Sequence, residues 1–251
     1  GKILKFANGA KITSADTIRN LVIDAGANTQ VITGQPVFIN LKTSNNKLYA
    51  TWFGVKGDGG NYSTALNYAM RVAANNNLKL ILPTGTIYTD ANLLLRSGLN
   101  INGDNTTINF RQGYGFIQFT GTAQNIRINN LNIKIVDTTA GVGVPVIQLV
   151  GTAPYGIKNV QINDVNIDAN RHGGITLRAV YVDSVSLNRV VAINSNSDGL
   201  YANNIRRFTV SNSKFTNNGQ SGIFLADGVK DCSLNNVVVS GVRTLAATGA
   251  S

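Results

Sequence analysis

The stretch from Asn125 to Gly241 repeats one short pattern five times, and this repeat decides the fold. The copies read NIRINNLNI (125–133), NVQINDVNI (159–167), SVSLNRVVA (184–192), RFTVSNSKF (207–215) and DCSLNNVVV (231–239). Their first residues lie 34, 25, 23 and 24 positions apart. An interval of this size is typical of supersecondary units that stack on one another.

The second and fourth residues of every copy are apolar, as in Ile126 and Ile128 or Val160 and Ile162. This alternation predicts a strand with one buried face. The segments between copies show no helical pattern, which excludes a βαβ unit. The repeat therefore predicts an all-β fold, a single-stranded parallel β-helix in which each coil lies about 4.8 Å from the previous one.

The fifth residue of the copies is nearly always polar and amide-bearing. It is Asn129, Asn163, Asn188, Ser211 and Asn235 in turn. These residues are expected in one column, at the bend after the inward pair, where stacked amides can bond one another. The alternative is that Asn occurs here only as a common turn residue.

A second family of strands is expected on the other side of each coil, at 146–150, 174–178, 199–203 and 222–226. Two apolar residues of each strand point inward and the residue between them points outward. The predicted outward column contains Gln148, Thr176, Tyr201 and Phe224. Gly199 and Gly222, each after a loop, mark the corner where the backbone turns.

The composition limits the fold class and the chemistry. Of 251 residues, 43% are apolar, enough for a sizeable core, and no apolar run approaches a membrane span. All acidic residues are Asp, which fits a chain with little helix and means that any carboxylate catalyst is an Asp. Cys232, the single cysteine, is predicted to be a small core residue, so disulfides and cysteine zinc sites are excluded. No metal or other cofactor is predicted.

The net charge of +10 suggests an anionic partner, such as an acidic polysaccharide, nucleic acid or a membrane surface. The basic residues are scattered, and Arg206-Arg207 is the nearest thing to a cluster. This scatter favours a polysaccharide over nucleic acid, and membrane insertion is not expected. A solvated basic surface without a specific role is the alternative. The chain opens Gly1-Lys2 without a visible signal peptide, which does not exclude export.

Two regions are expected along the chain. Residues 1–50 contain short alternating segments that form either irregular first coils or a cap over the stack, and residues 51–251 form the β-helix. A helix over Thr64–Ala74 is predicted, with Ser63 as its N-cap and with Leu66, Ala69, Met70 and Ala73 on one face. The tail 243–251 contains no capping pattern, so a longer protein is expected.

The segment Trp52-Phe-Gly-Val-Lys-Gly-Asp-Gly59, a short helix and Leu82-Pro-Thr-Gly-Thr-Ile-Tyr88 together resemble the entry segment of pectate-lyase-like right-handed β-helix proteins. The closest resemblance is to bacteriophage tailspikes and related polysaccharide depolymerases. It covers roughly residues 17–110 by motif and 111–241 by repeat architecture only. The family usually has an acidic pair after the Gly-Asp-Gly loop, where this chain has Asn61-Tyr-Ser-Thr64, and this departure weakens any metal or structural role for the loop.

This resemblance implies a right-handed coil with a short N-terminal capping helix, homotrimeric packing, and a location in a phage virion or outside the cell. Asn196-Ser-Asp-Gly199 resembles the Asn-Thr-Asp element of the polygalacturonase branch. That branch continues with a paired Asp and a Gly-His-Gly, where this chain has Asn217-Asn218 and Ser240-Gly-Val242. Asp198 is therefore either a turn residue or half of an acid pair with Asp168 or Asp227.

His172 and Arg171 lie together in the loop before the second strand family. A lyase removes the proton α to a sugar carboxylate and needs such a base near that carboxylate. The alternative is an exposed loop histidine without a catalytic role.

Tyr201 and Phe224, with Arg178 and Thr176 nearby, are predicted to bind sugar rings, or else to pack against a neighbouring subunit. The hypothesis is a polysaccharide-binding β-helix that degrades its ligand, as a hydrolase using Asp198 or as a lyase using His172 or Arg171. The competing hypothesis is a non-catalytic structural or adhesive shaft of a phage tail or cell surface.

Overall fold

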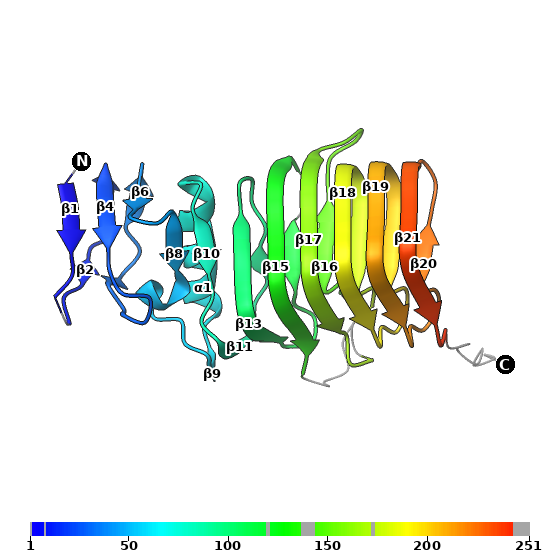
Figure 1. Cartoon of the computed structure of the whole chain (residues 1–251), viewed down its shortest axis with the longest axis horizontal. Coiled ribbons are helices and arrows are strands. Elements are labelled where there is room, and N and C mark those ends of the chain that lie inside the picture. The colour runs from blue at the N-terminus through cyan, green and yellow to red at the C-terminus, as the bar shows by residue number, and fades with distance from the viewer. Residues whose placement is uncertain (1, 8, 119–120, 137–143, 172–173, 243–251) are drawn as a thin grey trace.

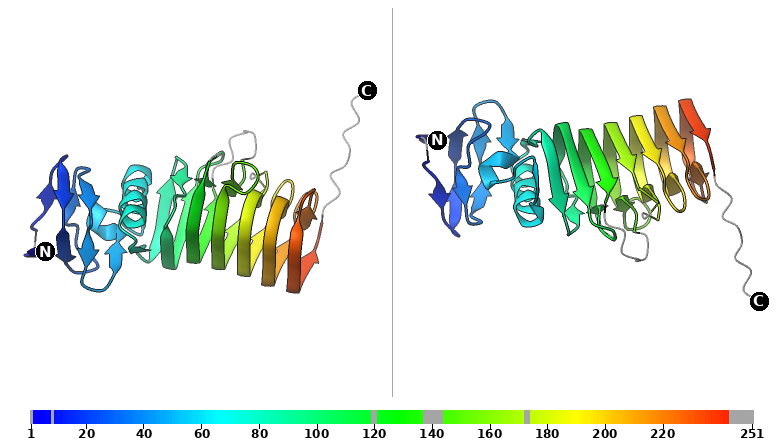
Figure 2. Two further views of the ribbon diagram at one scale, coloured as in Figure 1. Left: turned by 90° about the horizontal axis from the view of Figure 1, so that it is seen from above. Right: turned by 90° about the horizontal axis from the view of Figure 1, so that it is seen from below.

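The computed structural model describes residues 2–7, 9–118, 121–136, 144–171 and 174–242. The chain is a mostly-β parallel β-solenoid of about nine turns with one short helix, so the predicted parallel β-helix is confirmed. Figure 1 shows coils that follow one another along the long axis, from β1 (Lys2–Lys5) at one end to β21 (Lys230–Ser240) at the other. The two views in Figure 2 show the same order of coils from above and below.

One large parallel sheet of 14 strands runs through most of the molecule. Its strands are β8 (Lys47–Tyr49), β9 (Asp58–Asn61), β10 (Lys79–Ile81), β11 (Gly85–Thr89), β12 (Leu93–Leu94), β13 (Asn100–Phe110), β14 (Phe116–Gln118), β15 (Ala123–Ile135), β16 (Ile147–Val150), β17 (Ile157–Asp168), β18 (Leu177–Ile193), β19 (Leu200–Thr216), β20 (Ile223–Leu225) and β21.

The N-terminal strands form three small sheets in the orders β1-β4-β7, β2-β5 and β3-β6. Their pairings are also parallel, so they are short coils of the same kind. The strands are β2 (Ile12–Thr13), β3 (Thr17–Arg19), β4 (Leu21–Asp24), β5 (Ile32–Thr33), β6 (Val37–Ile39) and β7 (Lys42–Thr43).

The register of the large sheet places the five sequence copies directly above one another. Ile128 pairs with Ile162, which pairs with Leu187, and the column continues to Val210 and Leu234. The first four of these side chains are fully buried, as are the first four of the column that begins at Ile126 and ends at Phe208 and Cys232. The alternation therefore selects the inward face, because a shift of one residue would turn every apolar side chain outward.

The first and sixth residues of each copy have a left-handed backbone conformation, which bends the strand twice per coil. The values of φ at the first residues are 58, 54, 68, 55 and 50°, and those at the sixth residues are 52, 56, 53, 50 and 52°. Asn and Asp tolerate this conformation better than other residues with a Cβ atom. These residues are Asn125, Asn159, Ser184, Arg207 and Asp231, and then Asn130, Asp164, Arg189, Asn212 and Asn236.

The predicted ladder at the fifth residue is present over part of the column. Asn163 Nδ2 donates to Asn129 Oδ1 at 3.0 Å, and Ser211 Oγ donates to Asn188 Oδ1 at 3.0 Å. A second ladder follows the bend at the first residue, where Asn159 Nδ2 donates to Asn125 Oδ1 at 2.7 Å. The side-chain amides thus link neighbouring coils in addition to the backbone bonds.

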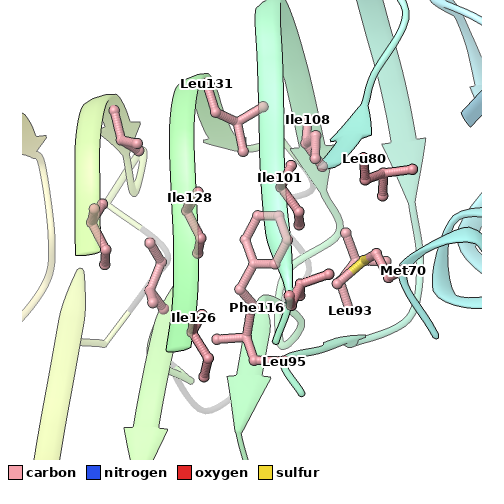
Figure 3. Close-up of a cluster of buried hydrophobic side chains, with 14 of the residues drawn as sticks. Met70, Leu80, Leu93, Leu95, Ile101, Ile108, Phe116, Ile126, Ile128 and Leu131 are labelled. Carbon is pink, nitrogen blue, oxygen red and sulfur yellow. The ribbon is translucent and has the colours of Figure 1, made fainter. Parts of the chain in front are cut away.

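The helix α1 (Ser63–Asn75) covers one side of the first coils of the large sheet, after the short 3₁₀ helix η1 (Ala50–Phe53). Its predicted apolar face is buried, and Figure 3 shows Met70 among Leu80 and Leu93 of the coil interior. The predicted N-cap is wrong: Tyr62 is the N-cap and makes no side-chain cap bond. Ser63 begins the helix, and its hydroxyl instead contacts Asn61, Thr89 and Asp90.

The Gly-Asp-Gly loop has a structural role despite its missing acidic pair. The Asp58 carboxylate accepts hydrogen bonds from the Gly60 N–H at 3.0 Å and the Tyr62 hydroxyl at 2.9 Å. Asp58 begins β9, so this segment is a short strand where a loop was predicted, and these bonds hold the pKa of Asp58 below its usual value.

Cys232 is not a core residue, although its register is inward as predicted. It pairs with the fully buried Phe208, yet its own side chain is exposed. The reason is its place in β21, because no described coil lies on the far side of that strand. Leu234 is 47% exposed for the same reason.

Candidate functional site

The outer face of the second strand family carries a column of polar and aromatic side chains. The register aligns Gln148 with Arg178, then with Tyr201 and Phe224. The Arg178 guanidinium lies over the Tyr201 ring at 5.8 Å, and the Tyr201 and Phe224 ring centroids are 5.6 Å apart at 35°. We call these four residues the outer ladder. The last three side chains contact one another along the solenoid axis, and Phe224 is 46% exposed.

Thr176 does not belong to the outer ladder, contrary to the prediction. Its side chain is completely buried, and its Oγ1 has no hydrogen-bond partner. Leu177 begins β18 and pairs with Leu200, so Thr176 lies at the buried corner before the strand, at the place that Gly199 holds one coil later. The prediction aligned Gly174 with Gly199, whereas the Gly174 carbonyl in fact accepts from the Ser197 N–H at 2.8 Å. Both alignments give an alternating apolar pattern, which is why the pattern did not separate them.

The corner before this strand family is a buried polar site around Asp198. The Asp198 side chain is only 6% exposed, and its Oδ1 accepts a hydrogen bond from the Ser221 N–H at 3.1 Å. Burial raises the pKa of this carboxyl above its usual value, and the bonds from Ser221 and Ser197 oppose that rise. A Cβ on Gly199 would lie 2.6 Å from the backbone oxygen of Gly222, so the corner requires glycine at this position.

The structure does not bring Asp227 to Asp198. The Asp227 carbonyl accepts from the Asn204 N–H at 2.8 Å, so Asp227 lies at the corner after the strand, whereas Asp198 lies before it. Asp168 ends β17, and its Oδ1 accepts bonds from the Asn170 N–H at 2.9 Å and from Asn194 Nδ2 at 3.0 Å. Asp168 is thus held by amides of its own loop and of the next coil.

Of the two candidate bases for a lyase, Arg171 lies in the described segment after β17. Arg171 is exposed, has φ of 60°, and donates its N–H to the Asn194 carbonyl at 2.7 Å. His172 lies outside the described residues. Among the described residues, no group of three or more His, Cys, Asp or Glu side chains is placed to hold a metal ion.

A pocket of about 520 Å³ at the next corner of the coil was missed by the sequence analysis. Its floor is the column Gln124, Lys158, Asp183 and Arg206, and the loop Thr152–Gly156 forms one wall. We call it the corner pocket. A signal for it was present, because the residue just before each sequence copy is polar or charged.

In the corner pocket, two partly exposed arginines form ion pairs with one buried carboxylate, that of Asp183. Arg206 Nη2 lies 2.9 Å from Asp183 Oδ2, and Arg207 Nη2 lies 2.7 Å from Asp183 Oδ1. The hydrogen bonds from Arg206 are the largest reason that the pKa of Asp183 is lowered. The Arg206 guanidinium also lies over the Tyr155 ring at 5.1 Å. Two arginines therefore converge on a carboxylate that stays ionised, beside an aromatic ring.

Comparison with known proteins supports the fold. No family model matches the chain, and no curated protein has a significantly similar sequence. The crystal structure of a "putative glycosyl hydrolase" from Parabacteroides merdae ATCC 43184 matches with a TM-score of 0.53 at 13% identity, over 77% of this chain and 95% of that one. ORF18 of Geobacillus virus E2 matches with a TM-score of 0.51 at 14% identity, over 77% of this chain but only 42% of the phage protein.

At these identities the likeness shows a common solenoid fold and no specific activity. Within the described residues, no helix has the length and apolar character needed to cross a membrane.

Proposed function

We propose that this protein binds a polysaccharide on the outer face of its solenoid, across the outer ladder. The observation that carries the proposal is the rigid succession of Gln148, Arg178, Tyr201 and Phe224 on four neighbouring coils. Amide and guanidinium donors bond sugar hydroxyls, and the faces of aromatic rings pack against the apolar faces of sugars. Because strands hold all four side chains, little conformational entropy is lost on binding.

A polymer fits this surface better than a single small molecule does. The ladder extends along the solenoid axis over four strands spaced about 4.8 Å apart, so its contacts repeat along a line. The distant likeness to a glycosyl hydrolase and to a phage protein agrees with a tailspike-like role in a virion or outside the cell.

Binding is tested by calorimetry with a panel of bacterial capsular and pectic polysaccharides. Tyr201→Ala is expected to weaken binding about tenfold, a loss of roughly 1.4 kcal/mol, with little change in melting temperature. Tyr88→Ala is the matched control, since Tyr88 is also a half-buried tyrosine of a strand, but on β11. If Tyr201→Ala binds like wild type and instead shifts the oligomer in sedimentation, the ladder is a subunit contact of the proposed trimer.

A second candidate function is cleavage of the bound polysaccharide, with Asp198 as general acid. The observation in its favour is the buried Asp198 carboxyl, because burial raises its pKa and so favours the protonated form that a general acid requires. Hydrolysis is supported if wild type releases new reducing ends, whereas Asp198→Asn still binds the polysaccharide but releases none. Absorbance from an unsaturated sugar would instead indicate a lyase using Arg171 or His172. If neither product forms with any ligand that binds, the protein is a non-catalytic adhesive shaft.

A further inference from the structure

We infer that the corner pocket binds the carboxylate-bearing sugar unit of an acidic polysaccharide. The inference rests on the proposed function and adds to it a second site and a ligand class. The pocket holds about 520 Å³, which is in the range of small-molecule sites and large enough for one sugar unit. It collects side chains from four successive coils, so a ligand placed there contacts several rigid strands at once.

The charges in the pocket favour an anion. Lys158, Arg206 and Arg207 surround one buried carboxylate, Asp183, and Asp231 adds a second acidic group near Arg206. The cations therefore outnumber the carboxylates. Asp183 is 5% exposed and holds both guanidinium groups in position before any ligand arrives. The exposed Lys158 ammonium remains available for a carboxylate from solvent.

The wall of the pocket is preorganised as well. The loop is anchored at both ends, because the Thr152 N–H donates to the Gly121 carbonyl at 3.0 Å and the Gly156 carbonyl accepts from the Ala123 N–H at 3.0 Å. A Cβ on Gly156 would lie 2.4 Å from the Gly121 oxygen, so the loop packs against the preceding coil. Tyr155, in this loop, is held against Arg206 and presents an aromatic surface next to the cations.

The remaining lining groups suit a sugar better than a nucleic acid. The lining includes hydroxyl and amide groups that both donate and accept hydrogen bonds, as sugar hydroxyls require. These groups belong to Ser97, Thr122, Gln124 and Thr152. A nucleic-acid surface instead needs a long basic stripe that follows many phosphates. The cations at this pocket form a local cluster and not a stripe, and Asp183 and Asp231 partly compensate their charge.

One polymer chain can contact both the corner pocket and the outer ladder. Arg206 and Tyr201 lie on the same strand, five residues apart, with the coil bending at Asn204, where φ is 50°. Five extended residues span at most about 17 Å. An acidic unit in the pocket would therefore leave neighbouring units within reach of the ladder.

The test compares acidic polysaccharides with their uncharged forms. Alginate, hyaluronate and polygalacturonate are each titrated calorimetrically against the full chain, next to the same polymer with its carboxyl groups reduced to alcohols. At least one acidic polymer is expected to bind, with affinity that falls about tenfold or more on carboxyl reduction and falls again in high salt. Binding of none of the three overturns the inference.

Variants then assign the binding to the pocket. Lys158→Gln should weaken binding of the acidic polymer about tenfold and leave binding of the reduced polymer unchanged. Lys214→Gln is the matched control, because Lys214 is also an exposed lysine of a strand, β19, but lies outside the pocket. Arg206→Lys keeps the positive charge but loses the paired bonds to Asp183. It should therefore weaken binding less than the double variant Lys158→Gln/Arg206→Gln does. Melting curves check that each variant folds.

The outcomes separate the two proposals. If Tyr201→Ala weakens binding but Lys158→Gln and Lys214→Gln behave alike, the proposed binding at the outer ladder is supported and the proposed binding in the corner pocket is wrong. If Lys158→Gln alone weakens binding, the pocket stands and the ladder is overturned as the contact surface. If a DNA oligonucleotide displaces the acidic polymer and binds more tightly in a Lys158-dependent way, the pocket is a nucleic-acid site and the inference is wrong.

Discussion

The regular stack from β13 to β21 and the N-terminal coils from β1 to β7 both consist of parallel coils, but they differ in strand length and in the number of sheets. The long strands of the stack have 11 to 17 residues and share one sheet; they are β15, β17, β18, β19 and β21. The strands β1 to β7 have only 2 to 4 residues and form three separate sheets. Both regions nevertheless use left-handed Asn residues and amide bonds between coils, such as Asn40 Nδ2 to Asn20 Oδ1 at 2.7 Å.

The comparison separates what makes a coil from what makes a stable stack. Bends and amide bonds recur wherever the chain coils, but long strands with two inward apolar columns occur only in the regular stack. The stack is therefore expected to contain most of the stability, because buried apolar area is the dominant favourable contribution to folding.

The largest expected effect is in the interior of the stack. Ile162→Ala removes a fully buried side chain from a middle coil and should cost about 2–5 kcal/mol of unfolding free energy. Ile39→Ala is the matched change in the N-terminal coils, where Ile39 is 40% exposed, and it should cost under about 1 kcal/mol. Denaturant unfolding of both variants measures the difference. Equal costs would show that stability is spread evenly over the two regions.

A smaller effect is expected at the left-handed bends. Asn212 has φ of 50°, and a β-branched residue is unfavourable there, so Asn212→Val should cost about 1–2 kcal/mol. Asn212→Gly relieves the backbone constraint and removes only the amide bonds. The glycine variant is therefore expected to be the more stable of the two in thermal melting. The reverse order would mean that the amide ladder, and not the backbone conformation, determines the choice of Asn.

The smallest effect concerns pH and also belongs to the stack. The pKa of Asp198 is raised in the folded state by burial, so its contribution to stability is present below the usual value of 3.8 and is lost as pH rises through the folded pKa. The pKa of Asp183 is lowered, so its contribution is present above 3.8 and is lost as pH falls through its folded pKa.

Asp198→Asn removes the first of these dependences. Relative to wild type, this variant should gain melting temperature as pH rises from 3.8 through the folded pKa of Asp198, while it keeps an oxygen for the Ser221 N–H bond. A constant difference across this range would contradict the assignment of a raised pKa to Asp198.

Much of the fold was predictable because its signals are local. The apolar alternation within each copy selects the buried face, and the constant interval implies stacking, as the buried column at Ile128 confirms. The helix was predicted to within one residue at each end, Thr64–Ala74 against Ser63–Asn75. Its N-cap was wrong because the Ser63 hydroxyl bonds to groups from a neighbouring coil, Thr89 and Asp90, which lie far away in the sequence.

Only the tertiary structure decided the composition of the sites. Arg178 replaces Thr176 in the outer ladder because backbone hydrogen bonds to the next coil set the start of β18, and two registers of that strand look equally apolar in sequence. The corner pocket needs residues from four coils and a loop, so no single segment predicts it.

The sequence alone determined the coil, its period and its inward face, since each repeat carries its own strand pattern and bend residues. Which charges meet at a corner, and whether Cys232 is covered, depend on the coils above and below, and stacking alone determines those contacts.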